Sequence, residues 1–356
     1  MHIVFRADAS VAIGNGHVMR CASLAHALQA KGAVCSFVCA SDVGHLNSYL
    51  QSQGFTVWAL DASLHAARSG AESLLTHWQA DARATMDAMQ NQSIDWVVVD
   101  HYGLDVQWET ALLSKVPHLM VIDDLANRAH CGELLLDANP GRWVDDYRAL
   151  TPSGCNTLVG PQYALMREEI RQASGMLRSE RRQHEPLNVL VTLGGVDKDN
   201  ITSHVLAVLN RLDSPVPLNI QVVMGPHAPW MAEVVDTSLT MRWPTHVAQN
   251  PSNFVALMCT HHIAIGAAGT SALERCCLGL PSINVVLAAN QKLSAKALHA
   301  SHAAGLVELH DGWEISLAQQ IQNLLTFEPW QAMQQACSHI TDGAGAERVA
   351  RELLNG

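Results

Sequence analysis

No stretch of the sequence contains the roughly 20 consecutive apolar residues that a membrane-spanning helix needs. The sequence is also poor in positive charge, with 22 basic against 33 acidic residues and a formal net charge of -11. Without a Lys/Arg-rich stripe, general binding to nucleic acid or to a membrane surface is not expected. One small phosphate-bearing ligand is compatible with this charge, because backbone amides and helix N-termini hold phosphate without net positive charge.

The cysteines and histidines lack the spacings of a disulfide framework or a metal site. The nine cysteines are odd in number, include the adjacent pair Cys276 and Cys277, and form no C-x-x-C motif. This pattern is typical of free thiols in a reducing compartment. Among the 19 histidines there is no H-E-x-x-H motif and no Cys/His set with zinc spacing. These spacings predict no metal, and no other cofactor is expected. Residues 1–6 have a strand pattern and not that of a signal peptide, so we predict a cytoplasmic protein.

Short apolar runs alternate with longer amphipathic stretches along the whole chain. This alternation predicts βαβ units and mostly parallel sheets that are covered on both faces. The predicted strands of the first half are 2–6, 34–40, 56–60, 96–100, 118–123, 134–137 and 157–160, and those of the second half are 187–193, 219–224, 263–266, 282–286 and 306–309.

The length of 356 residues suggests about two domains, each with a core of its own. The strand series is interrupted at 172–186, a stretch without a strand pattern that ends in Pro186. We therefore predict two doubly wound Rossmann-like lobes, 1–171 and 187–356, joined by this linker and facing each other across a cleft. Ligands of such sheets bind outside the carboxyl ends of the strands, so the loops after strands are the candidate sites.

The first candidate site follows the first strand and opens a helix. Gly14 and Gly16 permit a close approach of a ligand that a β-carbon would block. His17 falls in the first helical turn, where the positive end of the helix dipole favours the neutral imidazole. A neutral imidazole at a strand's carboxyl end can take a proton from water. The alternative is a glycine-rich turn with an incidental histidine.

The second candidate site is Asp100-His101-Tyr102-Gly103, directly after the apolar run 96–99. Polar side chains at the carboxyl end of a strand lie where active sites of α/β proteins form. Asp100 could orient a histidine, and the hydroxyl of Tyr102 could contact a sugar or position a water. The alternative is that Asp100 only caps the turn.

A third candidate site follows the first strand of the second lobe. The paired Gly194 and Gly195 precede a helix and could form a phosphate-accepting turn. Asp197 and Asp199 also spell the D-x-D of metal-dependent nucleotide-sugar transferases. We favour Asp199 or Asn200 as the N-cap of the following helix instead.

The fourth candidate site is a small-residue turn between the strand 263–266 and a helix. Its residues Ala268, Gly269, Thr270 and Ser271 expose free amides that could hold a diphosphate without a metal. The carboxylate of Glu274 could accept hydrogen bonds from two ribose hydroxyls. Alternatively, Ser271 and Glu274 form a capping box that only closes the helix start.

Two further residues follow at the edges of these segments. Asn290 comes after the strand 282–286, in a segment whose amides could contact the same ligand. Arg167 lies near the boundary of the two lobes and could reach a phosphate or a sugar. The alternative for Arg167 is a surface ion pair with Glu168 or Glu169.

Six segments resemble one family in their joint order along the chain. They are FRADASVAIGNGHVMRCASLA, VVVDHYGLD, VIDD, GPQYALMREEI, VTLGGVDKDN and AAGTSALERCCLGLP. Together they resemble the UDP-sugar hydrolases of the pseudaminic acid pathway, which remove UDP from UDP-2,4-diacetamido-2,4,6-trideoxy-β-L-altropyranose. The resemblance covers essentially the whole chain and implies the two-lobed GT-B fold, related to MurG-type glycosyltransferases.

The resemblance also implies roles for the candidate residues. His17 corresponds to the general base that activates water for an inverting, metal-independent attack on the anomeric carbon. Asp100 and Tyr102 belong to the same catalytic site, and Glu274 corresponds to the ribose-binding glutamate. From the residues and the resemblance together, the predicted substrate-binding positions are Gly14, Gly16, Arg167, Gly194, Gly195, Ala268, Gly269, Thr270, Ser271, Glu274 and Asn290.

The predicted function is therefore hydrolysis of a UDP-sugar, with water as the acceptor. An inverting MurG-like glycosyltransferase is the alternative, because the fold does not determine the acceptor. A non-catalytic nucleotide-sugar binder is a third hypothesis. The expected partner is the small-molecule UDP-sugar, without nucleic acid or membrane, and the expected state is a monomer.

Overall fold

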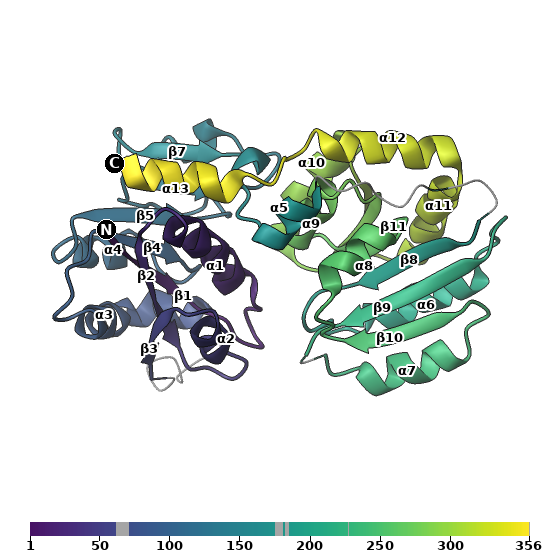
Figure 1. Cartoon of the computed structure of the whole chain (residues 1–356), viewed down its shortest axis with the longest axis horizontal. Helices are drawn as coiled ribbons and strands as arrows, with labels where there is room; N and C mark the ends of the chain where they lie inside the picture. The colour runs from purple at the N-terminus through teal and green to yellow at the C-terminus, as the bar shows by residue number, and fades with distance from the viewer. Residues whose placement is uncertain (62–70, 175–180, 182–184, 227, 356) are drawn as a thin grey trace. The chain divides into compact units, whose positions relative to one another are not determined.

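The computed structural model describes residues 1–61, 71–174, 181, 185–226 and 228–355. The chain forms two compact units, one of Met1–Met166 with Ala344–Gly356 and one of Arg167–Gly343. Each unit contains its own parallel sheet with helices packed on it (Figure 1). Across the described ranges, no helix combines the length and apolarity that a membrane crossing requires.

The first unit is built on a seven-stranded sheet in the order β3-β2-β1-β4-β5-β6-β7. The strand order reverses between β1 and β4, whose register pairs Ala7 with Asp100. All five residues of β4 are buried, as expected for a parallel strand covered on both faces. The elements of this unit are β1 (His2–Ala7), α1 (Gly16–Gln29), β2 (Val34–Ala40), α2 (Asn47–Ser52), β3 (Thr56–Leu60), α3 (Ala71–Ala88), β4 (Trp96–Asp100), α4 (Val106–Leu112), β5 (His118–Ile122), β6 (Leu134–Asp137), η2 (Val144–Tyr147), β7 (Asn156–Val159), η3 (Pro161–Tyr163) and α13 (Gly345–Asn355).

The second unit is built on a six-stranded sheet in the order β10-β9-β8-β11-β12-β13, with the reversal between β8 and β11. Numbered within the unit, this is the 3-2-1-4-5-6 order of the Rossmann fold. Its elements are α5 (Glu168–Ser174), β8 (Leu187–Thr192), α6 (Ile201–Arg211), β9 (Leu218–Met224), α7 (Met231–Leu239), β10 (Thr245–Gln249), α8 (Phe254–Thr260), β11 (Ile263–Ala267), α9 (Ser271–Cys277), β12 (Ser282–Val286), η4 (Ala289–Gln291), α10 (Lys292–Ala300), β13 (Gly305–Glu308), α11 (Trp313–Leu325) and α12 (Phe327–Ser338).

The predicted fold class of two Rossmann-like lobes is confirmed. Every predicted strand is present with its ends within one residue of the prediction. The sequence pattern missed β10, which lies at the edge of its sheet and pairs with β9. No residue of β10 is fully buried, so its sequence carries no apolar run that would indicate a strand.

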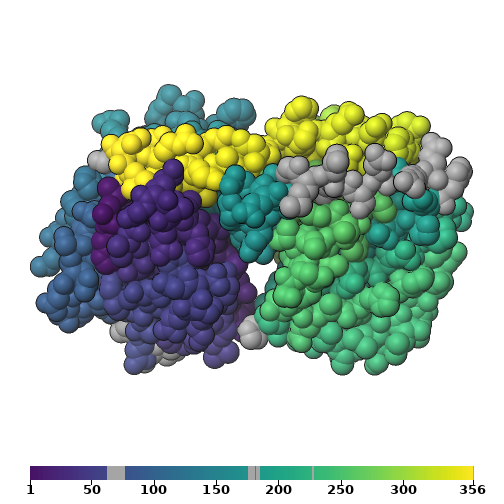
Figure 2. All heavy atoms as spheres, in the orientation of Figure 1, coloured from purple at the N-terminus to yellow at the C-terminus, as the bar shows by residue number. Residues whose placement is uncertain are grey.

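The division of the chain differs from the predicted lobes 1–171 and 187–356. The second unit begins at Arg167, and the chain returns to the first unit at Ala344. The reason for the return is α13, whose Val349 and Leu353 are fully buried in the core of the first unit. In Figure 2 the atoms of α13 (yellow) lie against those of α1 (purple). Part of the predicted linker 172–186 lies outside the described residues.

Candidate active site

The first group of predicted residues lies at the carboxyl ends of β1 and β4, where the strand order reverses. The loop after β1 is closed by backbone hydrogen bonds between Ser10 and Gly14, at 3.3 and 2.8 Å. Gly14 has a φ of +79°, a conformation that L side chains rarely adopt. Beyond this turn, Gly16 begins α1 and places His17 in its first turn. The predicted strand–turn–helix context of His17 is thus present.

His17 is held by a buried carboxylate. Its Nδ1 lies 2.6 Å from Oδ1 of Asp100, whose side chain is fully buried, while the His17 side chain is 7% exposed. An ionised carboxylate only accepts hydrogen bonds, so this contact assigns the proton to Nδ1. The other ring nitrogen, Nε2, is then the acceptor. Asp100 is therefore hydrogen-bonded to a histidine, and its role in orienting His17 stays a prediction.

Arg20, one helical turn after His17, holds the same carboxylate. Its Nε donates to Oδ2 of Asp100 and its Nη2 to Oδ1, each at 2.6 Å. Its third nitrogen, Nη1, donates to Oδ2 of Asp124 at 3.0 Å. The Tyr102 hydroxyl donates to the same Asp124 oxygen at 3.1 Å, and the Tyr102 ring meets His17 edge-on, with 4.6 Å between the ring centroids. The three predicted catalytic residues thus belong to one hydrogen-bonded cluster.

The carboxyl of Asp100 is strongly acidic in this cluster. Burial alone would raise its pKa, but the charge of Arg20 and the hydrogen bonds from Arg20 and His17 outweigh burial. Together they hold the pKa of Asp100 far below its usual range. Asp100 is therefore a permanent anion that can orient His17 and stabilise its charged form, but cannot take up its proton.

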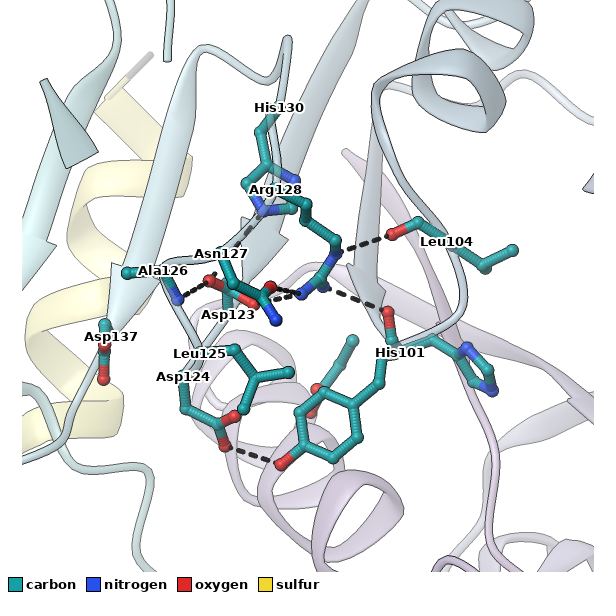
Figure 3. Close-up of polar contacts among 12 residues, drawn as sticks. His101, Leu104, Asp123, Asp124, Leu125, Ala126, Asn127, Arg128, His130 and Asp137 are labelled. Atoms are coloured by element: carbon teal, nitrogen blue, oxygen red, sulfur yellow. Dashed lines mark hydrogen bonds and ion pairs between the residues drawn. The ribbon is translucent and has the colours of Figure 1, made fainter. Parts of the chain in front are cut away.

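The loop after β5 braces this cluster. Arg128 donates to Oδ1 of Asp123 at 2.6 Å and to the carbonyl oxygens of His101 and Leu104, each at 3.2 Å (Figure 3). The carbonyls belong to the segment that carries Tyr102. Burial would raise the pKa of Asp123, and hydrogen bonds together with the charge of Arg128 lower it well below its usual range. The sequence motif VIDD thus supplies one bracing carboxylate and one carboxylate for Arg20.

In the second unit, the glycine pair after β8 lies beside the end of β11. Gly194 has a φ of +88°, and a β-carbon on it would lie 3.9 Å from Cβ of Ala267. Gly195 is exposed, and the backbone of Gly225 packs so closely on its carbonyl that a β-carbon on Gly225 would lie 1.9 Å from the oxygen. The turns after β8 and β11 are therefore neighbours at the reversal point of the sheet.

The D-x-D interpretation finds no support in the hydrogen bonds of this segment. Asp197 accepts the backbone N–H groups of Ile201 and Thr202, both at 2.9 Å, and so satisfies the first turn of α6. Asn200 is the N-cap and accepts the N–H of Ser203 at 3.4 Å. The predicted capping role of Asn200 is confirmed, and Asp197 contributes a second cap.

A buried arginine donates hydrogen bonds to the residues that flank the turn of Ala268, Gly269 and Thr270. Arg275, which is fully buried, donates Nη2 to the carbonyl of Ala267 at 2.8 Å and to Oδ1 of Asn284 at 2.7 Å. Its Nη1 donates to Oγ of Ser271 at 3.2 Å. The segment that contains Asn290 is adjacent, because a β-carbon on Gly269 would lie 3.7 Å from Nε2 of Gln291.

Glu274 forms an ion pair that neither sequence interpretation anticipated. Arg167 donates Nε to Oε1 of Glu274 at 3.1 Å and Nη2 to Oε2 at 3.3 Å. The alternative, a capping box of Ser271 and Glu274, is not formed, because Thr270 is the N-cap of α9 and its side chain makes no capping hydrogen bond. Glu168, one of the two glutamates in the alternative interpretation of Arg167, binds Arg171.

Sequence reasoning missed two functional candidates, Arg20 and Asp124. Arg20 stands three residues after His17, which places both side chains on one face of α1. The three-residue spacing from His17 was therefore the sequence signal that could have identified Arg20. Asp124 follows β5, the strand next to β4, but the sequence does not show which strands are neighbours.

Comparison with solved structures identifies the fold. The crystal structure of MurG from Acinetobacter baumannii, a GT-B protein, superposes with a TM-score of 0.70, is 16% identical and covers 100% of both chains. The chain therefore has the GT-B fold. No model of a known protein family matches the sequence.

Two curated proteins show distant sequence similarity. The UDP-2,4-diacetamido-2,4,6-trideoxy-beta-L-altropyranose hydrolase of Campylobacter jejuni is 25% identical over 59% of this chain. The match spans 66% of that relative, slightly less than two thirds of its length. The spore coat polysaccharide biosynthesis protein SpsG of Bacillus subtilis is 23% identical over 99% of this chain and 98% of its own.

Proposed function

We propose that the protein hydrolyses UDP-2,4-diacetamido-2,4,6-trideoxy-β-L-altropyranose to UDP and the free sugar in pseudaminic acid biosynthesis. The similarity to the Campylobacter jejuni hydrolase and the GT-B fold support this proposal. The observation that carries it is the buried hydrogen bond between Asp100 and Nδ1 of His17. It leaves Nε2 as a basic nitrogen at the reversal point of the first sheet, where α/β proteins bind ligands.

In the proposed reaction, Nε2 of His17 takes a proton from water as the water oxygen bonds to the anomeric carbon. The bond between this carbon and the phosphate oxygen breaks on the opposite face, and its electron pair leaves with UDP. The configuration at the anomeric carbon is inverted. Asp100 stabilises the imidazolium that forms, and Tyr102 positions the water or the sugar.

The second unit is proposed to hold UDP without a metal. The turns at Gly194–Gly195 and 268–271 present backbone amides, which bind phosphate and stabilise the negative charge of the departing UDP. Glu274 is proposed to accept hydrogen bonds from the ribose hydroxyls, and Arg167 to orient its carboxylate. Asn290 is proposed as a further contact of UDP, because its neighbour Gln291 lies beside Gly269.

An inverting glycosyl transfer is the second candidate, because the fold matches that of MurG over the whole chain. The same base would then remove a proton from an acceptor hydroxyl. Incubation with the UDP-sugar, without acceptor and with EDTA, separates the candidates. UDP release is expected under these conditions. UDP release only after an acceptor is added would favour transfer, and binding of the UDP-sugar without any release would favour a nucleotide-sugar binder. UDP release that occurs without EDTA but is lost with EDTA would refute the metal-free reaction.

The role of His17 is tested by the substitution His17→Asn. The amide can still donate to Asp100 but offers no basic nitrogen, so turnover should fall about 10²–10⁴-fold while UDP affinity stays close to that of the wild type. His26→Asn is the matched control, because His26 is exposed in the last turn of the same helix. Near-normal turnover of His17→Asn would remove His17 from the mechanism.

A further inference from the structure

Arg20 contacts His17 itself and the two carboxylates of the hydrogen-bonded cluster, those of Asp100 and Asp124. It donates to both oxygens of Asp100 at 2.6 Å and to Asp124 at 3.0 Å, and its Nη2 lies 3.2 Å from Nδ1 of His17. Its side chain is 15% exposed, so these contacts are shielded from solvent. A bidentate guanidinium–carboxylate pair of this kind fixes geometry as well as charge.

We propose that Arg20 is a positioning residue of the reaction described above, on which this inference rests. It holds the Asp100 carboxylate in line with His17 and offsets part of its negative charge. Arg20 does not touch the reacting atoms in this account. It acts through Asp100, and through Asp124 it also sets the position of Tyr102.

The physical reason is a competition between two requirements of a general base. Asp100 must lie close enough to His17 to assign its proton to Nδ1. A lone buried carboxylate at 2.6 Å would also favour the imidazolium, which cannot accept a proton. The positive charge of Arg20 on the same carboxylate weakens this preference but leaves the hydrogen bond in place.

The other charged groups around His17 are compatible with the role proposed for Arg20. Besides Arg20 and Asp100, Asp124 contributes a negative charge from the end of β5, and this carboxylate is shared by Arg20 and Tyr102. His101 adds no positive charge at neutral pH, because burial lowers its pKa to about 4. The titratable and charged groups that face His17 are Arg20 and Cys21 from α1, Asp100, His101 and Tyr102 from β4 and its loop, and Asp124 from the loop after β5.

The test compares Arg20→Met with Arg20→Lys. Methionine keeps an unbranched side chain of similar length but carries no charge. Lysine restores the positive charge but cannot form the bidentate hydrogen bonds of the guanidinium. In Arg20→Met the acid limb of the pH–rate profile should move up by about one pH unit, with the plateau rate about tenfold lower and UDP affinity unchanged. Arg20→Lys should return the acid limb to the wild-type position while the plateau rate stays reduced.

Arg128→Met is the matched control. Arg128 is also a largely buried arginine that binds an aspartate of the first unit, but no contact joins it to Asp100 or His17 in the described structure. Its loss should lower the free energy of unfolding without moving the acid limb. An unmoved acid limb in Arg20→Met, or an equal shift in Arg128→Met, would overturn the assignment of Arg20.

A readout without turnover separates this inference from the proposed reaction. In ¹⁵N-histidine NMR spectra, the His17 signals are identified by their loss in His17→Asn. The midpoint of their pH titration should be higher in Arg20→Met than in the wild type and should return in Arg20→Lys. An unchanged midpoint refutes the role of Arg20 even if UDP is released, whereas a shifted midpoint without UDP release refutes only the proposed reaction.

Discussion

Gly266→Ala is expected to disrupt the turn that we assign to UDP. Gly266 lies in β11, and a β-carbon on it would lie 2.6 Å from Nη1 of Arg275, 2.8 Å from its Cζ and 3.1 Å from the carbonyl oxygen of Thr192. Non-bonded carbon atoms settle at about 3.5–4.0 Å, so the guanidinium would have to move by roughly 1 Å. Arg275 is fully buried, which leaves it no solvent to move into.

The cost follows from the hydrogen bonds that Arg275 would lose. It donates to the carbonyl of Ala267 at 2.8 Å and to Asn284 at 2.7 Å. A hydrogen bond to a charged group contributes about 1.5–3 kcal/mol, so the loss of both corresponds to a fall of about 3–6 kcal/mol in the free energy of unfolding. Because the same contacts hold the turn at 268–271, UDP affinity should fall about tenfold, or roughly 1.4 kcal/mol.

Urea denaturation and UDP titration calorimetry measure the two effects. Gly154→Ala is the matched control, because a β-carbon on this exposed glycine meets no atom within 4 Å. The control should stay within about 0.5 kcal/mol of the wild type, as ordinary surface substitutions do. A Gly266→Ala protein as stable as the control, with unchanged UDP affinity, would refute the role given to Arg275.

Two further predictions concern the first unit. Asp100→Asn should lower turnover about 10²–10⁴-fold in the UDP-release assay, because the neutral amide no longer assigns the proton of His17 or balances Arg20; turnover within tenfold of the wild type would contradict this. His101 has a pKa lowered to about 4 by burial, against about 6.5 in the unfolded chain, so its contribution to stability is present above pH 6.5 and is lost as the pH falls through 4. In urea denaturation, the stability of His101→Asn should therefore depend less on pH between 6.5 and 4 than that of the wild type, by about 2–3 kcal/mol.

The sheets could be predicted from the sequence because most strands are buried on both faces. The run of β11 and the first four residues of β4, in which every residue is buried, are continuous apolar segments. The edge strand β10 has no such run and was missed. The return of α13 to the first unit was also missed, since an amphipathic helix pattern does not tell which sheet the helix covers.

The hydrogen-bonded cluster around His17 was predictable in part. The positions of His17, Asp100 and Tyr102 followed from their places after strands, whereas their mutual contacts depend on β1 and β4 being neighbours. Asp100 is 80 residues from Arg20, and Asp124 is 104 residues from it. Contacts at such separations arise from the strand order, which local patterns do not encode. Local patterns therefore assigned no function to Arg20, although it lies in the first of the six segments that carry the family resemblance.

The ion pair of Arg167 with Glu274 shows the same limit. The local alternatives, a helix cap for Glu274 and a neighbouring glutamate for Arg167, are what sequence spacing suggests. The structure instead joins these side chains over 107 residues. Both residues had been selected as ligand contacts, but the contact between them required the folded second unit.

Hydrolysis of the UDP-sugar in ¹⁸O-enriched water, without acceptor and with EDTA, tests the central proposal most directly. Attack of water on the anomeric carbon leaves the bridging oxygen on UDP, so the released UDP should carry no ¹⁸O by mass spectrometry. Its release should depend on His17 and not on His26. Incorporation of ¹⁸O into UDP would show attack at phosphorus, and the absence of UDP release by the wild type would contradict the proposed function altogether.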